Sequence, residues 1–540
     1  MSTTKRFDIK KVAIIGGGPG GLSTLNELLH TSKDGTSTIT KATVNNPLPE
    51  NPAFEQITVF EQNDHFGGVW NFTKKTDPPF PEGLKQYFDP AGIRTKLETP
   101  SFNDLLRTDK QHPIVQDISE NKDVIRYFWR HSGLYEKLFT NIPNHLMRFS
   151  SGYDVEVPNP DPRSKKYAPF VIHSDVEAYL EEYVKEAKLE KYIRYNTVVD
   201  RVFKKDGKWQ IVLLQINEKN KTIGWYLEQF DAVVVATGRF NIPFFPKIEG
   251  LQDFVNSNPG VVIHAKAFRN EQDRGTEKVL LVGTSVSAVD LLQYLIPKYQ
   301  EVHLSGNVSK VTNVKETKLE KDANWTDQLI ANPNLKVRRH PRIKSFEGDK
   351  VTFEDGTSEQ GFERIIFATG YHIYYPFLDI PENDGKDYVS VSSGLDGVQN
   401  YARTKIDNLY LYTFSYGDPT LAHIGIAHNP LFFLACEANA IAIAGVWSNK
   451  HKLPSKEEQR KWIDGRFVGK KSGFQVFNEQ NIQYFISELY KFSADGRYNF
   501  IPLVEGLDIS DAKDKLKKLF ARFVEGGLEE TSTPDPQTTE

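Results

Sequence analysis

The sequence predicts an α/β fold with two Rossmann-like dinucleotide-binding domains, one of them inserted into the other. Two strand–glycine-turn–helix units carry this prediction, near residues 12–29 and 279–296. Short apolar runs alternate with helix patterns along much of the chain, as in a parallel sheet covered by helices. Two matching Ala-Thr-Gly segments, 236–238 and 368–370, end on a glycine that permits a sharp backbone turn. We interpret them as the points where the chain crosses between the domains.

The composition excludes several classes of protein. Of the 540 residues 39% are hydrophobic, so a large buried core is expected and global disorder is not. A net charge of −4 gives no overall attraction to nucleic acid or to an anionic membrane. A single cysteine, Cys436, excludes an internal disulfide, a CxxC redox pair and a cysteine-based zinc site. Because neither a signal-peptide pattern nor an apolar stretch of about 20 residues is present, we expect a cytoplasmic protein without a transmembrane segment.

The first glycine turn has the pattern of a dinucleotide-binding site. Residues 12–15 are a short β-branched run typical of a buried parallel strand, and GGGPGG follows at 16–21. Within this GxGxxG pattern Gly16 permits the tight turn, Gly18 lets the backbone approach a pyrophosphate, and Gly21 lets helix and strand pack closely. A helix pattern begins here, and its N-terminal N–H groups would face the phosphates. The cofactor-binding residues expected in this turn are Gly16, Gly18, Pro19, Gly20 and Gly21.

A carboxylate closes the next strand, at 57–60. Glu61 stands where an acidic residue accepts hydrogen bonds from ribose hydroxyls, which favours the unphosphorylated ribose of FAD or NAD. The separation from Gly21 is 40 residues instead of the usual ~20. A polar stretch at 31–52, interpreted as a surface insertion, accounts for the excess. A solvated charge at the strand end is the alternative interpretation of Glu61.

A glycine pair and a tryptophan come shortly after Glu61. In the segment 67–70, GGVW, the glycines would bring the backbone close to a flat ligand and Trp70 would wall it. A turn followed by a core aromatic residue is the alternative. The cofactor-binding residues expected here are Gln62, Gly68, Val69 and Trp70.

The second glycine turn, after the strand at 279–282, is less complete. It keeps the first glycine but has serine and alanine where the other two glycines would stand, and such small residues still permit close approach. An ordinary βα turn is a serious alternative for this segment alone. Two such units in one chain suggest two dinucleotides and electron transfer between them. The residues expected to bind the second cofactor are Gly283, Thr284, Ser285, Val286, Ser287 and Ala288.

The remaining elements follow from hydrophobic patterns. Further strands are expected at 232–235, 302–304, 365–367 and 409–411, and a helix with good periodicity near 176–187. The most apolar segment, 432–443, is interrupted by Glu437 and Asn439, so we interpret it as a buried helix. A last amphipathic pattern includes Leu516, Leu519 and Phe520 beside several lysines. It could touch a membrane surface, but we favour a helix packed on the body of the protein. The polar, acidic tail at 526–540 is expected to be disordered.

These motifs, in this order, resemble those of the flavin-containing monooxygenase family over roughly residues 10–460. GGGPGG, Glu61 and the segment 67–70 are similar to that family's FAD site. Residues 367–371, FATGY, and 453–455, LPS, resemble two further landmarks. The family fingerprint FxGxxxHxxxF/Y, followed by a basic residue, is matched by Gly260, His264, Phe268 and Arg269, with Asn258 in place of the opening aromatic residue.

The resemblance implies a soluble FAD- and NADPH-dependent monooxygenase of the N,N-dimethylaniline monooxygenase type. NADPH would reduce FAD, the reduced flavin would capture O₂ as a C4a-hydroperoxide, and one oxygen atom would pass to sulfur or nitrogen of a small nucleophilic molecule. It also implies an FAD-binding domain at 1–243 and 366–540, ending in a helical extension and the disordered tail, with an NADPH-binding domain at 244–365. Further cofactor-binding residues that it implies are Val199, Thr237, Gly238, His264, Lys310, Thr369 and Gly370.

The chain departs from the family pattern at two places. Where the family has an asparagine near the flavin edge, this chain has Pro100, which can donate no hydrogen bond. Asn103 is the substitute we expect as a catalytic residue, and a loop or helix-cap asparagine is the alternative. The strand after the second glycine turn ends in Ser-Gly-Asn at 305–307, without the family's arginine, and Lys310 is the nearest cation. Preference for NADPH over NADH is therefore left open.

Other functions remain as alternatives. An uncoupled NAD(P)H oxidase that releases H₂O₂, or a flavin-binding protein without turnover, would fit the loss of the asparagine. A Baeyer–Villiger monooxygenase ranks lower, because its fingerprint usually has Trp where Phe268 stands. The histidines show no metal-ligand spacing, so we expect no metal. A homodimer is compatible with the sequence, and nothing in it identifies the substrate.

Overall fold

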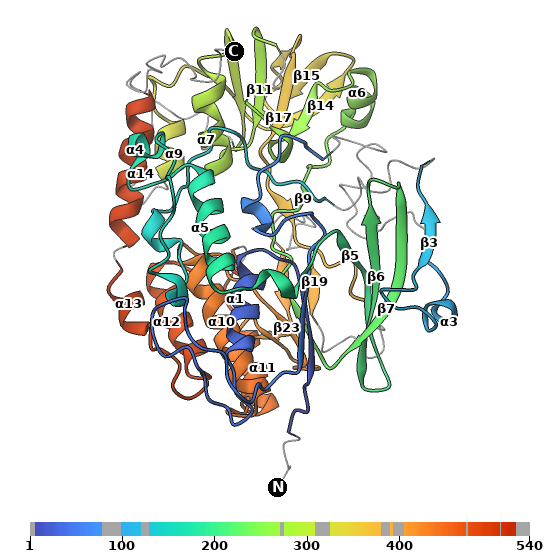
Figure 1. The fold of residues 1–540 in the computed structure, drawn as a ribbon. Coiled ribbons are helices and arrows are strands. Elements are labelled where there is room, and N and C mark those ends of the chain that lie inside the picture. The colour runs from blue at the N-terminus through green and yellow to red at the C-terminus, as the bar shows by residue number, and fades with distance from the viewer. Residues whose placement is uncertain are drawn as a thin grey trace, which may run out of the picture. The chain divides into compact units, whose positions relative to one another are not determined.

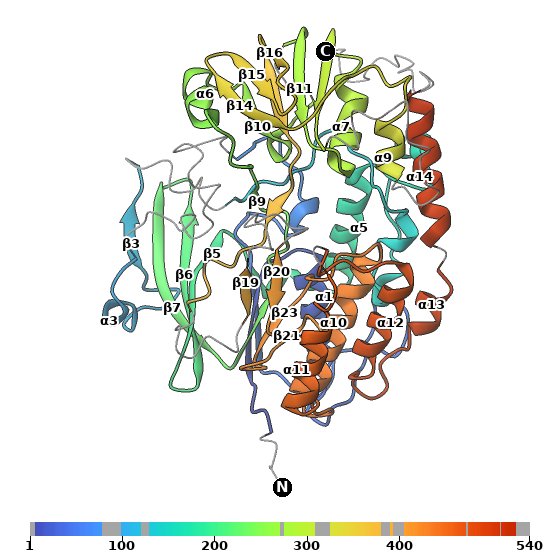
Figure 2. The same ribbon diagram turned by 180° about the vertical axis from the view of Figure 1, so that it is seen from behind.

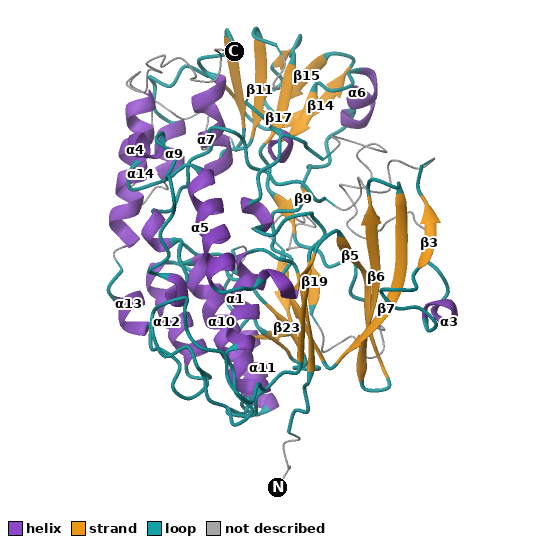
Figure 3. Ribbon diagram, in the orientation of Figure 1, coloured by secondary structure: helices purple, strands orange, loops and turns teal. Residues whose placement is uncertain are grey.

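The computed structural model describes residues 6–77, 99–119, 129–270, 275–307, 325–379, 389–392, 404–470, 473–507 and 509–524. The chain forms two compact units. Unit 1 comprises Met1–Pro246 and Gly370–Leu507, and unit 2 comprises Lys247–Thr369 and Asp508–Glu540. Each unit contains helices and strands, as the colours of Figure 3 show, and each has a sheet with parallel central strands. The predicted α/β fold, with one Rossmann-like domain inserted into another, is confirmed.

The main sheet of unit 1 has seven strands in the order β21-β22-β23-β8-β1-β2-β4. In the parallel ladders around β1, Ile15 lies opposite Phe60 on one side and opposite Val235 on the other. These central strands are buried, as their apolar runs predict. The strand expected at 409–411 ends one residue early, because Leu411 turns the chain with a φ of 50°. The strands are β1 (Lys11–Ile15), β2 (Gln56–Phe60), β4 (Ile193–Arg194), β8 (Ala232–Val235), β21 (Leu409–Tyr410), β22 (Phe414–Ser415) and β23 (Leu421–His423).

Unit 1 also holds a four-stranded antiparallel sheet, β3-β7-β6-β5, that the sequence analysis missed. Most of β6 is buried on both faces, which removes the alternation that identifies a half-exposed strand. A signal was present in Asp206-Gly207, whose φ values of 51° and 77° suit the tight turn between β5 and β6. The strands are β3 (Ile114–Asp117), β5 (Thr197–Lys205), β6 (Lys208–Asn217) and β7 (Thr222–Phe230), and two small ladders pair β9 (Ile242–Pro243) with β18 (Tyr371–His372) and β19 (Ser390–Ser392) with β20 (Lys405–Asp407).

Helices α1 and α10 lie on one side of the seven-stranded sheet, and the four-stranded sheet lies on the other (Figures 1 and 2). The apolar segment at 432–443 forms the almost fully buried α10, as predicted. The α-helices of unit 1 are α1 (Pro19–Leu29), α3 (Phe102–Leu105), α4 (Ser164–Tyr167), α5 (His173–Glu186), α10 (Phe432–Trp447), α11 (Lys456–Gly465), α12 (Glu479–Tyr490) and α13 (Ile501–Glu505), and its 3₁₀ turns are η1 (Gly68–Trp70), η4 (Asn144–Leu146), η5 (Ser150–Gly152) and η6 (Glu190–Tyr192).

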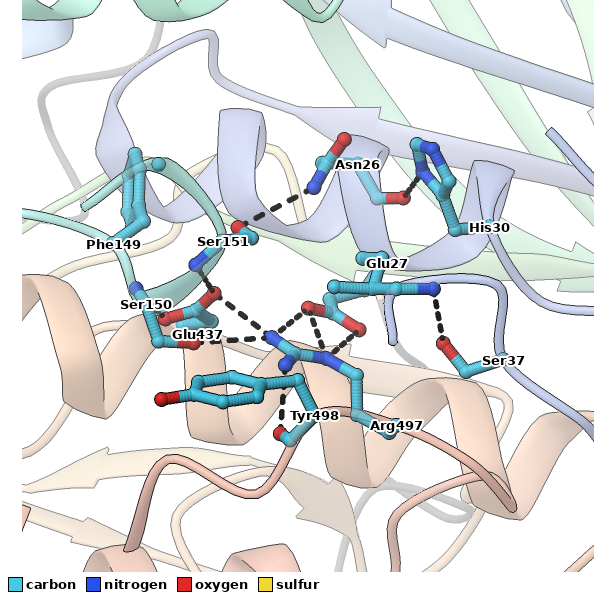
Figure 4. Close-up of polar contacts among 12 residues, drawn as sticks. Asn26, Glu27, His30, Ser37, Phe149, Ser150, Ser151, Glu437, Arg497 and Tyr498 are labelled. Atoms are coloured by element: carbon cyan, nitrogen blue, oxygen red, sulfur yellow. Dashed lines mark hydrogen bonds and ion pairs between the residues drawn. The ribbon is translucent and has the colours of Figure 1, made fainter. Parts of the chain in front are cut away.

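A buried ion cluster joins three distant segments of unit 1 (Figure 4). Arg497 lies between Glu27 of α1 and Glu437 of α10, with its Nη2 2.7 Å from Glu27 Oε1 and 2.9 Å from Glu437 Oε1. The backbone N–H groups of Ser150 and Ser151 donate to the Glu437 carboxylate. The two buried carboxylates thus receive hydrogen bonds from one guanidinium group and two backbone N–H groups. We call Glu27, Glu437 and Arg497 the Arg497 cluster.

The stretch at 31–52 is not simply the surface insertion that its polarity suggested. Ile39 is fully buried, and the stretch hydrogen-bonds along the segment that carries Arg497. The N–H of Ser37 donates to the carbonyl of Asp495, and the N–H of Tyr498 donates to the carbonyl of Ile39. The insertion therefore holds the C-terminal part of unit 1 in place.

Unit 2 is built on a five-stranded parallel sheet in the order β10-β17-β11-β12-β13, with a three-stranded antiparallel sheet, β14-β15-β16. The strands predicted near 279, 302 and 365 are its three middle strands. Its elements are α6 (Leu251–Ser257), β10 (Val262–His264), η7 (Ala265–Ala267), β11 (Lys278–Val282), α7 (Val286–Leu295), β12 (Glu301–Ser305), α9 (Trp325–Ile330), β13 (Arg338–His340), β14 (Ile343–Glu347), β15 (Lys350–Phe353), β16 (Ser358–Glu359), β17 (Arg364–Phe367) and α14 (Ile509–Val524).

The last helix, α14, belongs to unit 2, whereas the sequence analysis assigned all of 366–540 to the first domain. Its apolar side chains Leu516, Leu519 and Phe520 are buried, and the Phe520 ring stacks on Trp325 of α9 at 5.3 Å. This is the packed helix that we favoured over a membrane contact. The tail at 526–540 lies outside the described residues. Across the part of the chain that the structure describes, no helix is both long and apolar enough to cross a bilayer.

We expect Arg497→Met to destabilise unit 1 by about 3–5 kcal/mol, because it leaves two buried carboxylates without their cation. The measurement is the free energy of unfolding in urea. Lys450→Met is the matched control, since Lys450 pairs with Asp495 at the surface and such pairs contribute less than about 1 kcal/mol. Equal losses in the two variants would contradict a structural role for the Arg497 cluster.

Candidate functional site

The first glycine turn closes over the end of β1 and leaves no room for a side chain at Gly16 or Gly21. Gly16 has a φ of 107°, and a Cβ there would lie 2.6 Å from the carbonyl oxygen of Ala236. A Cβ on Gly21 would lie 1.9 Å from the carbonyl oxygen of Gly16, so helix α1 can begin here only with glycine. A Cβ on Gly20 would lie 2.9 Å from Ile424. Pro19 is the first residue of α1, where its missing N–H costs nothing.

The Glu61 carboxylate is buried and tied to the same turn. Its Oε2 accepts the N–H of Gly17 at 2.7 Å, and its Oε1 accepts the N–H of Asn63 at 2.9 Å. Burial raises the pKa of Glu61, while these two N–H groups oppose that shift. The acidic residue is therefore not the solvated strand-end charge of our alternative interpretation. It lies against the turn that would hold a dinucleotide.

The segment at 67–70 meets the glycine turn backbone to backbone. A Cβ on Gly68 would lie 2.9 Å from the Cα of Gly18, and the N–H of Gly67 donates to the carbonyl of Gly17. Val69 and Trp70 continue this segment as the half-buried η1. Gln62, also half-buried, lies beside Glu61. The two glycine segments thus form one surface of bare backbone, which we call the glycine cradle (residues 16–21 and 67–68).

Both Ala-Thr-Gly segments follow the strand that neighbours a glycine turn. Thr237 accepts a hydrogen bond from Asn241 on its carbonyl, and Gly238 has a φ of 69° with open space where a Cβ would be. Gly370 has a φ of 88° and similar open space, and it follows Thr369 where unit 2 ends. The residues just beyond the segments pair as β9 and β18. The second segment spans the boundary between the units at Thr369 and Gly370, whereas the first ends about eight residues before the boundary at Pro246. The glycine of each segment faces open space.

The second glycine turn is built in the same way as the first. Gly283 has a φ of 129°, and a Cβ there would lie 2.4 Å from the carbonyl oxygen of Ala368. Its N–H donates to the backbone carbonyl of Ser305, just as the N–H of Gly16 donates to the backbone carbonyl of Phe60. The turn continues into α7 with Ser285 as N-cap residue, Ala288 buried, and the side chains of Thr284, Val286 and Ser287 partly or fully exposed.

The position that corresponds to Glu61 is occupied in unit 2 by Gly306. A Cβ on Gly306 would lie 2.2 Å from the methyl group of Thr284, so a side chain at this strand end would have to displace that of Thr284. The buried Ser305 hydroxyl donates to the carbonyl of Pro341, so its proton is already used within the protein. The second turn therefore has no acidic residue at its strand end.

Two expected site residues, Asn103 and Lys310, lie away from the cradle or outside the described residues. Asn103 is an exposed residue of α3, which packs on β7 at the outer edge of the four-stranded sheet, away from α1 in Figures 1 and 2. The structure does not bring Asn103 to the glycine cradle. Pro100 is half-buried beside Thr99, whose hydroxyl donates to Asp200. Lys310 lies outside the described residues.

The other two expected cofactor residues occupy strands. Val199 lies in β5, and β5 begins beside the first site because the N–H of Thr197 donates to the carbonyl of Glu61. His264 ends β10 in unit 2, where its Nδ1 accepts the N–H of Lys266 as a cap for η7. The basic residue of the fingerprint, Arg269, is buried and donates to the carbonyls of Lys266 and Phe268.

Sequence reasoning missed a polar group of residues near the first crossing. Arg239 donates to the carbonyls of Gly425 and Ala427, which follow β23. Next to them His423 is fully buried, and burial lowers its pKa to about 3, so its ring is neutral. Among the described residues, neither His423 ring nitrogen nor the Tyr375 hydroxyl, whose ring lies edge-on at 5.3 Å, has a hydrogen-bond partner. A histidine at the end of an apolar strand run was the available signal.

Comparison with known proteins agrees with this geometry. The model of the flavin-binding monooxygenase-like family matches residues 120–312 and 311–483. The chain belongs to this family. Its relatives include the flavin-containing monooxygenase iboF of Amanita muscaria, 27% identical over 88% of this chain and 85% of the relative. The flavin-containing monooxygenase FMO GS-OX-like 9 of Arabidopsis thaliana is 26% identical over 86% of this chain and 81% of the relative.

Solved structures of similar fold cover nearly the whole chain. The S-allyl-L-cysteine S-oxygenase from Allium sativum matches with a TM-score of 0.63 and 23% identity, over 97% of this chain and 99% of that one. Tmm from Pelagibacter sp. strain HTCC7211 matches with a TM-score of 0.61 and 22% identity, over 96% and 91%. At this identity the likeness supports the fold of this flavin-binding monooxygenase-like protein.

Two glycine substitutions should separate folding from flavin binding in this monooxygenase. A Cβ on Gly18 would lie 3.4 Å from Gly68, which is ordinary contact, and its φ of −77° suits any residue. Gly18→Ala should therefore keep the Tm of the flavin-free protein but lower flavin affinity at least tenfold, because the methyl group covers the cradle.

Gly21→Ala should instead lower the stability of the flavin-free protein by more than about 2 kcal/mol, because its methyl group meets the Gly16 carbonyl oxygen. Flavin titration by fluorescence and thermal unfolding of the flavin-free protein give the two readouts. Unchanged flavin affinity in Gly18→Ala would show that the cradle does not hold the cofactor.

Glu177 of α5 should make the stability of this protein depend on pH. Burial and the nearby Glu181 carboxylate raise the pKa of Glu177 to about 7, whereas an unfolded chain releases this proton near 4.5. The folded protein then binds the extra proton between these values, so stability falls as pH rises from about 4.5 to 7. Glu177→Gln should be more stable than the unmodified protein above pH 7 and equal to it below pH 4.5.

Thermal unfolding across pH 4–8.5 measures this difference. Glu190→Gln, an exposed glutamate beyond the same helix, is the control and should not change the pH profile. A Glu177→Gln curve parallel to that of the unmodified protein would contradict the assignment.

Proposed function

We propose that this protein is an FAD- and NADPH-dependent monooxygenase that inserts one oxygen atom of O₂ into sulfur or nitrogen of a small nucleophilic molecule. The observation that carries the proposal is the pair of glycine turns. Each first glycine lies under the carbonyl of an Ala-Thr-Gly segment, Ala236 for Gly16 and Ala368 for Gly283. An acidic strand end accompanies the first turn alone. Two dinucleotides with different ribose requirements fit this arrangement.

FAD is assigned to unit 1 because the glycine cradle suits its pyrophosphate. Gly18 and Gly68 present backbone without side chains, and the N-terminus of the 11-residue α1 opens toward the same place. The remaining acceptor capacity of the Glu61 carboxylate would bind the hydroxyls of an unphosphorylated ribose. Trp70, in the segment that touches the cradle, is placed to border the cofactor.

NADPH is assigned to unit 2 because its strand end carries no negative charge. An acidic residue at this position selects the 2′-hydroxyl of NAD and repels a 2′-phosphate. Gly306 removes that repulsion, and Ser285 at the start of α7 makes no side-chain cap hydrogen bond, which leaves its hydroxyl for a phosphate. Lys310, close in sequence to Gly306, is the cation that we expect to pair with the 2′-phosphate.

In the proposed reaction the bound flavin supplies the chemistry with NADPH and O₂. The chain binds and orients the cofactors through its two glycine turns. The overall balance is NADPH, a proton, O₂ and the substrate giving NADP⁺, water and the oxygenated product. Neutral His423 and the Tyr375 hydroxyl, both without a protein partner among the described residues, are the polar groups of unit 1 that we expect to face bound ligand or water.

A second function is favoured by one observation. Asn103 lies on α3 at the outer edge of the four-stranded sheet, so it does not replace the missing asparagine at Pro100. A protein that lacks this amide would lose oxygen from the flavin as H₂O₂. An uncoupled NAD(P)H oxidase is therefore the alternative to the monooxygenase.

Product stoichiometry distinguishes these functions. Purified flavoprotein is given NADPH with a thioether, a tertiary amine or a cyclic ketone, and NADPH consumption, oxygenated product and H₂O₂ are measured together, with NADH in parallel. We expect sulfoxide or N-oxide close to one per NADPH, and slower turnover with NADH. H₂O₂ equal to NADPH consumed would establish the oxidase, lactone from the ketone a Baeyer–Villiger enzyme, and no NADPH consumption a non-catalytic flavin-binding protein.

A further inference from the structure

Two histidines that are 37 residues apart meet inside unit 2. His303 lies in β12 and His340 ends the neighbouring strand β13, with Nδ1 of His303 2.8 Å from Nε2 of His340. Glu359, at the end of β16, adds a carboxylate oxygen, and the three atoms all lie within 4.8 Å of one another. The sequence analysis expected no metal, because no short spacing links these residues. Adjacent parallel strands bring them together instead.

The surroundings keep both imidazoles neutral, which is the charge state that binds metal ions. Burial lowers the pKa of His303, and burial together with His303 lowers the pKa of His340 to about 4, so both rings are neutral near pH 7. Nε2 of His303 lies 3.3 Å from Oε2 of Glu301. This contact favours the His303 tautomer with its proton on Nε2, so Nδ1 accepts the Nε2–H of His340. To bind an ion through Nε2, His340 would carry its proton on Nδ1 instead. A carboxylate behind the imidazole is the usual outer partner of a metal-bound histidine.

We propose that His303, His340 and Glu359 form a binding site for a divalent ion of the zinc type, with water as the fourth ligand. Two nitrogens, one carboxylate oxygen and an open position are a ligand set that zinc commonly takes. Zn–N bonds of about 2.0–2.1 Å in a tetrahedron place the two nitrogens about 3.3 Å apart, so the rings must separate by about half an ångström. The ion would join β12 and β13 of the parallel sheet to β16 of the antiparallel sheet.

The charges around the cluster allow Glu359 to exchange its ion pair with Lys278 for a bond to the metal ion. Lys278 now pairs with Glu359 at 2.6 Å and also donates to the carbonyl of Gln360 at 3.0 Å. It can therefore release the carboxylate to the ion and still keep one partner. Arg338 stays 3.3 Å from Glu301 and balances the outer carboxylate. Glu359 is 24% exposed at its side chain, which gives the ion a route from solvent.

Zinc retention tests the proposal without reference to turnover. Full-length protein without a polyhistidine tag is dialysed against buffered micromolar Zn²⁺, and zinc per chain is measured by mass spectrometry together with the Tm. We expect about one retained ion per chain and a higher Tm with zinc. His340→Asn should abolish retention, and Glu359→Gln, at a partly exposed position, should weaken it at least tenfold while the protein stays folded.

Two further variants separate this site from general zinc adsorption. Lys278→Met removes the competitor for Glu359 and should tighten zinc binding several-fold. His112→Asn removes an exposed histidine in unit 1 and should change nothing. Zinc retention below one-tenth per chain, or retention unchanged in both Glu359→Gln and His340→Asn, would overturn the proposal and leave the two histidines as a hydrogen-bonded pair.

Discussion

Contact between a glycine and a backbone carbonyl determines how each unit of this protein is built. The carbonyl of Ala236 occupies the space where Gly16 would carry a side chain, and the carbonyl of Ala368 does the same at Gly283. In each unit the strand with the glycine and the strand with the alanine are parallel neighbours. The turn can then pass over the strand end and start a helix whose N–H groups face outward. The turn takes this path because no side chain fits at its first glycine.

The two units differ where their second strands end. In unit 1 a carboxylate folds back on the turn, and the N–H of Gly17 fixes its direction. In unit 2 the corresponding residue is Gly306, which has neither a charge nor a side chain and lies against the side chain of Thr284. Under the proposed function, one backbone design would serve two chemically different ribose sites. The proposed pairing of an unphosphorylated with a phosphorylated dinucleotide rests on this single difference.

The sequence patterns correctly predicted those features that depend on residues close together along the chain. The buried strands, both glycine turns, the Glu61 strand end and the buried α10 all depend on residues that are close in sequence. The four-stranded sheet was missed because β6 is buried on both faces, although Asp206-Gly207 marked its hairpin. The partners of Arg497 could not be predicted, since 470 residues separate it from Glu27. Asn103 was chosen by its distance from Pro100 along the chain, and the fold carries it to an outer edge.

The Arg497 cluster can form only late in the synthesis of the chain. Glu27 leaves the ribosome early and Glu437 late, and their guanidinium partner follows only 60 residues after Glu437. Until then the Glu27 carboxylate of α1 lacks the cation that it pairs with in the folded protein. The strands of the second unit are contiguous in sequence, between 247 and 369, and are complete long before. The core of unit 1 can therefore be completed only after residue 497 has been made, whereas the sheet of unit 2 can form earlier.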